Sequence, residues 1–112
     1  MGEAWFTGCA DELARCLVAA RTCAETCEEY IDDAALDGDE LRRVVHILAA
    51  PAAVSRVLID LIDHPPPLVL AAVRLCRDLT ASAADELQSP PNVVAALRAV
   101  SASAAELLEA AG

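Results

Sequence analysis

The chain has 112 residues, a net charge of −10 and a pI near 4.4, and none of its eight basic residues is lysine. Hydrophobic residues make up 56% of it and aromatic residues only 3%, with much of the apolar content supplied by alanine. The length indicates one domain spanning residues 1–112, and the composition favours packed helices over a sheet. An acidic chain without a basic patch is poorly suited to nucleic acid or to an anionic membrane, so we expect neither as a partner.

Four stretches of helical periodicity follow one another along the chain, separated by short segments rich in proline, glycine and aspartate. They are residues 4–33, 39–62, 67–88 and 91–110. Asp39 is placed to cap the second helix, and Pro66 or Pro67 to occupy the first turn of the third. Pro51 should kink the second helix or split it. Because short connections make consecutive helices antiparallel, the sequence predicts an all-α, antiparallel up-down-up-down four-helix bundle.

Four cysteines lie along one side of the first predicted helix. Cys9, Cys16, Cys23 and Cys27 are spaced seven, seven and four residues apart. Since each residue turns a helix by about 100°, all four fit within an arc of roughly 40°. The charged residues of this stretch lie mostly on the opposite side. We therefore expect this row of thiols to line the interior of the bundle.

The third helix supplies the fifth cysteine. Its predicted apolar face comprises Val69, Ala72, Cys76, Leu79, Ala83 and Leu87. The fourth helix has an apolar face without cysteine, comprising Val93, Leu97, Val100, Ala104, Leu107 and Leu108. A rise of about 1.5 Å per residue places Cys76 between the heights of Cys16 and Cys23. The third helix is thus predicted to complete a thiol cluster with the first.

Thiolates are the ligands that select soft metals such as Cu(I), which is satisfied by two sulfur atoms. Cys23 and Cys27 are stacked neighbours one helical turn apart and form the strongest candidate pair. Aligned cysteines have poor disulfide geometry, and one helix does not supply the four tetrahedral ligands of zinc. His46 falls on the polar side of its helix, so we interpret it as solvated. The sequence predicts a Cu(I) site whose ligands are Cys16, Cys23, Cys27 and Cys76, with Cys9 as a weaker outer ligand.

Two segments also carry a family likeness. The segment from Arg15 to Tyr30, with its run Cys-Ala-Glu-Thr-Cys-Glu, resembles the cysteine-rich four-helix-bundle copper-binding proteins of the copper storage family. Residues 75–87 look like the matching third helix. The resemblance implies a bundle whose core cysteines hold Cu(I), often as a homo-oligomer.

The chain departs from the pattern of that family at several core positions. Thr80, Ala83 and Leu87 stand where the family places further cysteines, and the second and fourth helices contain none. The resemblance is therefore to a member that has lost most core cysteines. It implies a low-capacity protein for copper buffering or delivery, binding roughly two to four ions, rather than one for bulk storage.

Other functions stay open on the sequence. A few-cysteine copper site with open coordination could serve a copper-dependent oxidoreductase, with Tyr30 lining its pocket. The thiols could instead sense redox changes, or be small buried hydrophobes in a metal-free interaction scaffold that uses Trp5 and Phe6 as anchors. No segment has a signal-peptide pattern, and the run Val44–Ser55 is too short to span a bilayer, so we expect a cytoplasmic protein.

Overall fold

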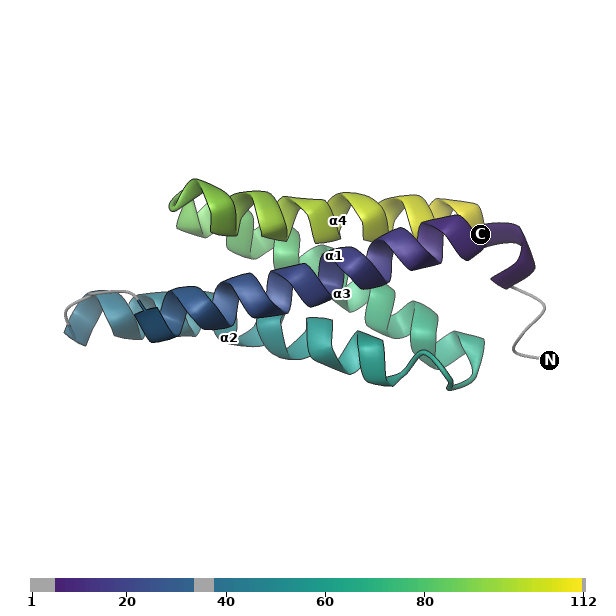
Figure 1. The fold of residues 1–112 in the computed structure, drawn as a ribbon, viewed down its shortest axis with the longest axis horizontal. Helices are drawn as coiled ribbons and strands as arrows, with labels where there is room; N and C mark the ends of the chain where they lie inside the picture. The colour runs from purple at the N-terminus through teal and green to yellow at the C-terminus, as the bar shows by residue number, and fades with distance from the viewer. Residues whose placement is uncertain (1–5, 34–37, 112) are drawn as a thin grey trace.

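The computed structural model describes residues 6–33 and 38–111. They form four α-helices, α1 (Phe6–Asp33), α2 (Gly38–Asp60), α3 (Pro66–Leu87) and α4 (Pro91–Ala111) (Figure 1). No strand occurs in this part of the chain, so the all-α prediction is confirmed. Where the structure describes them, the helix ends lie within two residues of the predicted ends.

The four helices form an antiparallel bundle. Helices α1 and α3 each pack against both α2 and α4. Consecutive helices run in opposite directions, so α1 begins and α4 ends at the same end of the molecule (Figure 1). The bundle is long and narrow, with extents of 50, 20 and 17 Å. The predicted up-down-up-down topology is confirmed.

Local sequence signals account for some of the helix ends. Pro66 and Pro67 fill the first turn of α3, where proline's missing amide hydrogen breaks no helical bond. That helix ends at Leu87, and the next residue, Gln88, forms its C-cap with a backbone in the left-handed region at φ 62°. Helix α2 begins at Gly38, so Asp39 lies inside its first turn and the prediction that Asp39 is the cap is wrong. The carboxylate instead interacts favourably with the positive end of the helix dipole.

One irregular point in the helices lies away from the prolines. Helix α2 continues through Pro51, so the predicted split does not occur. The ring of Pro51 is fully buried, and its burial offsets the backbone hydrogen bond that proline cannot donate. Helix α1 departs from helical geometry at Cys9, with φ −141° and ψ 28°. The first cysteine of the row therefore sits at a kink, and its heptad spacing alone does not fix its direction.

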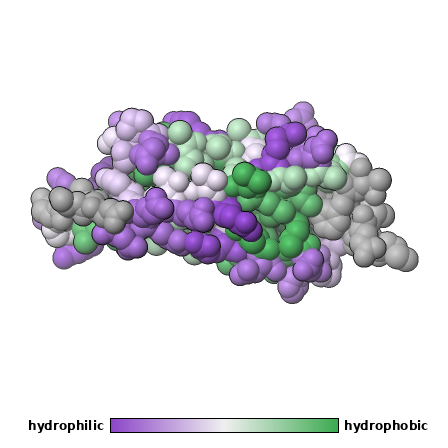
Figure 2. Space-filling model, in the orientation of Figure 1, coloured by the Kyte–Doolittle hydropathy of each residue, from purple (hydrophilic) through white to green (hydrophobic). Residues whose placement is uncertain are grey.

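The core is aliphatic and runs the length of the bundle. Its largest fully buried side chains include Leu48, Leu58, Leu97 and Leu107. The predicted apolar faces of α3 and α4 are buried, except that Leu79 and Leu108 are only half-buried. Figure 2 shows mostly hydrophilic side chains on one face, interrupted by a hydrophobic area. None of the described helices combines the length and hydrophobicity needed to cross a membrane.

Candidate thiol site in the bundle core

All five cysteines lie in the core. Cys16, Cys23, Cys27 and Cys76 have no exposed surface, and Cys9 is 1% exposed. None of the five, all within the described residues, is in a disulfide. The prediction that the cysteine row of α1 faces inward, together with Cys76 of α3, is therefore confirmed.

Cys23 and Cys27 form a thiol pair in direct contact. Their sulfur atoms lie 3.9 Å apart, one turn of α1 from each other, and share an S–H···S hydrogen bond. The bond to Cys27 lowers the pKa of Cys23 below its ordinary value. The same bond, followed by burial, raises the pKa of Cys27. Cys23 is thus the member of the pair that ionises first.

Cys76 is the contribution of α3 to the group of buried thiols. Its thiol donates a hydrogen bond to the backbone carbonyl of Val54 on α2, with a sulfur-to-oxygen distance of 3.5 Å. Burial raises the pKa of Cys76 to about 12, and the nearby charges of Cys16 and Cys23 contribute to the increase. Electrostatic coupling to both cysteines agrees with the predicted height of Cys76 between them.

Three hydroxyl groups accompany the thiols, and the sequence reasoning did not recognise two of them. Thr80, already noted, is fully buried and donates to the carbonyl of Cys76 at 2.6 Å. The hydroxyl of Ser55, on α2, is fully buried beside Cys23 and helps to lower the pKa of that thiol. Ser103, on α4, lies beside Cys16. A small polar residue at an otherwise apolar position of a helix is the signal that could have identified both serines.

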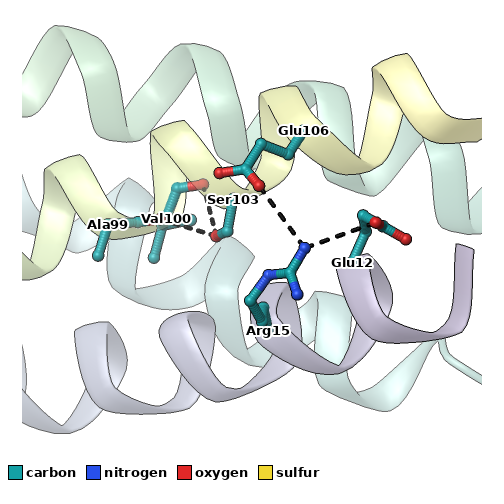
Figure 3. Close-up of polar contacts among 6 residues, drawn as sticks. All are labelled: Glu12, Arg15, Ala99, Val100, Ser103 and Glu106. Atoms are coloured by element: carbon teal, nitrogen blue, oxygen red, sulfur yellow. Dashed lines mark hydrogen bonds and ion pairs between the residues drawn. The ribbon is translucent and has the colours of Figure 1, made fainter.

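Several polar contacts lie near Cys16 where α1 packs against α4. The guanidinium of Arg15 lies between the carboxylates of Glu12 and Glu106, at 3.5 and 3.7 Å (Figure 3). The hydroxyl of Ser103 donates to the carbonyl four residues earlier in α4, at 2.7 Å (Figure 3). Burial raises the pKa of the Cys16 thiol, and Ser103 counteracts part of that increase.

An ion pair joins α1 to α2 next to Cys27. Both carboxylate oxygens of Glu28 accept hydrogen bonds from Arg56, with the Nε contact at 3.0 Å. These bonds hold the pKa of Glu28 below its ordinary value. The ion pair is exposed, so it bridges α1 and α2 at the surface rather than entering the thiol site.

The other residues that the sequence singled out lie away from the Cys23–Cys27 pair or outside the described structure. Cys9 is buried at the kink of α1, where burial and the charge of Glu12 raise its pKa. His46 is exposed, as predicted. Tyr30 is half-buried and lines a surface hollow near Glu40 at the end of the bundle. Trp5 and the side chain of Phe6 lie outside the described part of the structure.

In this conformation, fewer side chains are positioned to bind one metal ion together than the sequence predicted. Within residues 6–33 and 38–111, no three cysteine, histidine or acidic side chains converge closely enough to hold a metal ion without rearrangement. Cys23 and Cys27 are positioned as a pair, whereas Cys76 directs its thiol at a carbonyl. A closed four-ligand zinc site is not formed by these residues in this conformation.

No protein-family model, curated protein or solved structure matches the chain. The fold and the site define a helical bundle with thiols buried along its core.

Proposed function

We propose that this protein binds Cu(I) at low capacity through its core thiols and serves in copper buffering or delivery. The observation that carries the proposal is the Cys23–Cys27 pair, with sulfur atoms 3.9 Å apart in a fully buried position. Soft thiolate ligands favour Cu(I), and burial protects that ion from water. The copper is the cargo of the protein in this proposal.

The spacing of the pair is compatible with one bound ion. Thiolate sulfur binds zinc, an ion of comparable size, at about 2.3 Å, so two sulfurs on one ion can be at most about 4.6 Å apart. The observed separation of 3.9 Å falls within that limit, and small side-chain rotations would adjust it. Binding would release the two thiol protons to solvent and form two sulfur–copper bonds, with no change in oxidation state.

Further ligands would come from the neighbouring thiols. Cys76 and Cys16 lie close enough to couple electrostatically, so they are the natural ligands of a second ion. Cys76 would have to release the Val54 carbonyl to take part. Cys9, at the kink of α1, would be the outer ligand. Five thiols with sulfur bridging set the capacity at roughly two to four ions per chain.

The experiment is an anaerobic Cu(I) titration of the reduced protein against a chromogenic Cu(I) chelator. The expected result is tight binding of two to four ions per chain, with affinity falling at low pH because protons compete for the thiolates. More ions than the thiols can ligate would show that the ligand assignment is wrong. Size-exclusion chromatography of the loaded protein tests the homo-oligomer that the family likeness suggests.

A metal-free interaction scaffold is the second candidate. It is favoured by the absence, among the described residues, of three converging ligands. In that case the thiols are small core hydrophobes. A titration in which the protein takes no Cu(I) from the chelator would favour the scaffold over the copper protein.

A further inference from the structure

Ser55 is a buried polar residue whose hydrogen bonding is incomplete. It lies on α2 with no exposed surface. Among the described residues, no donor or acceptor meets its hydroxyl with hydrogen-bond geometry. An unsatisfied buried hydroxyl destabilises a fold, and most are paired in native proteins. Its presence in an alanine-rich core therefore calls for a physical reason.

Serine and threonine inside a helix usually satisfy the hydroxyl within that helix. Thr80 donates to the carbonyl of Cys76, and Ser103 donates to the carbonyl of Ala99, in each case four residues earlier. This local bond is the common arrangement for such residues. Ser55 departs from it, so its hydroxyl remains available to a group from another helix.

The surroundings of Ser55 are the thiols themselves. Its hydroxyl lies beside the sulfur of Cys23 on α1. The preceding residue, Val54, accepts the hydrogen bond of the Cys76 thiol through its carbonyl. The following residue, Arg56, pairs with Glu28 on α1. Three consecutive residues of α2 therefore contact the cysteine-bearing helices, and Ser55 is the one that lies beside Cys23.

A Cu(I) ion held by two thiolates leaves one net negative charge in the core. Burying a charge is costly unless hydrogen-bond donors stabilise it. Charge-assisted hydrogen bonds are also stronger than neutral ones, and groups that hydrogen-bond to metal ligands affect metal affinity. The guanidinium of Arg56 is committed to Glu28 at the surface, so it does not serve this purpose here.

We propose that Ser55 is a positioning residue of the copper site, whose hydroxyl donates a hydrogen bond to the sulfur of Cys23 once that sulfur is bound to Cu(I). This inference rests on the proposed function. It explains why a hydroxyl without a partner is kept in the core: its partner is the metal-bound thiolate. It also assigns α2, which has no cysteine, a direct role in the site.

The test compares the wild type with Ser55→Ala and with Thr80→Val. The first substitution removes the unpaired hydroxyl, and the second removes a buried hydroxyl that is already bonded within its own helix. Each metal-free protein is melted by circular dichroism, and each is titrated anaerobically with Cu(I) against a chelator. The ultraviolet absorption of the copper–thiolate bonds is recorded in the same titration.

We expect Ser55→Ala to lower Cu(I) affinity about tenfold, as for the loss of one hydrogen bond to a charged group, and to shift the copper–thiolate absorption. Its metal-free melting temperature should be unchanged or higher, because a group without a partner has been removed. Thr80→Val should retain the affinity and the absorption of the wild type.

Other outcomes overturn the inference in distinguishable ways. Equal Cu(I) affinities for Ser55→Ala and the wild type would show that the hydroxyl does not act on the site, while leaving the proposed function intact. A lower melting temperature of metal-free Ser55→Ala would assign Ser55 a structural role instead. A wild type that binds no Cu(I) would overturn the proposed function, and the role of Ser55 with it.

Discussion

The buried thiol of Cys76 should make the stability of the metal-free protein fall in alkaline solution. Its pKa is about 12 in the folded protein, against an ordinary value of 9.0. A group whose pKa is raised by folding contributes stability that is fully present below the unfolded pKa and is lost as pH rises through the folded pKa. The loss for Cys76 therefore lies between about pH 9 and pH 12.

The magnitude follows from the size of the shift. Each pKa unit corresponds to about 1.4 kcal/mol, so the full shift amounts to about 4 kcal/mol above pH 12. At pH 11 the calculated loss in the free energy of unfolding is about 2.7 kcal/mol. Solvent screening of the thiolate reduces the expected loss to about 2 kcal/mol. This is a large share of the stability of a small domain, which is typically about 5–15 kcal/mol.

The assay is urea unfolding of reduced, metal-free protein under anaerobic conditions, followed by circular dichroism from pH 8 to pH 11. The matched variant is Cys76→Ala, which keeps an apolar core position but has no ionisable group there. The other cysteines titrate in both proteins, so the difference in unfolding free energy reports the ionisation of Cys76 together with its coupling to Cys16 and Cys23. The wild type should lose about 2 kcal/mol more than the variant over this range.

Parallel stability curves for the two proteins would refute this reasoning. They would mean that Cys76 ionises as easily in the folded chain as in the unfolded one, and hence that its thiol is not held in the dry core. The same proton must leave if Cys76 binds copper. Copper binding that involves Cys76 should therefore strengthen as pH rises.

Four further predictions concern the site and the fold. The double change Cys23→Ser with Cys27→Ser should remove the tightest Cu(I) ion in a chelator titration, and retention of that ion would place the site elsewhere. Cys76→Ser should weaken Cu(I) binding while leaving the helical dichroism intact, because a hydroxyl is a poor ligand for a soft metal; unchanged affinity would exclude α3 from the site. Leu97→Ala should lower the free energy of unfolding by about 2–5 kcal/mol in urea titrations, since Leu97 is fully buried, and a loss below about 1 kcal/mol would contradict that burial. Gln88→Gly should raise stability by up to about 1 kcal/mol, because glycine adopts the observed φ of 62° without strain, whereas a destabilised variant would show that the glutamine side chain stabilises the turn.

Helical periodicity and the cysteine spacing determined much of this protein in advance. The seven- and four-residue intervals place Cys16, Cys23 and Cys27 on one side of α1, and amphipathicity requires that side to be buried. The same periodicity identified Cys76 as a core residue and His46 as a surface one. These features depend on local geometry, which repeats regularly along a helix and can be derived from the order of the residues.

The tertiary structure decided which groups meet. Periodicity cannot predict that Cys76 bonds to the carbonyl of Val54, because that contact depends on how α2 and α3 pack. It cannot predict that Ser55 faces Cys23, or that the backbone kink falls at Cys9 while α2 continues through Pro51. Distances between helices, side-chain rotamers and desolvation arise only when the four helices come together. These properties set the pKa values of the thiols and decide which of them can bind a metal ion together.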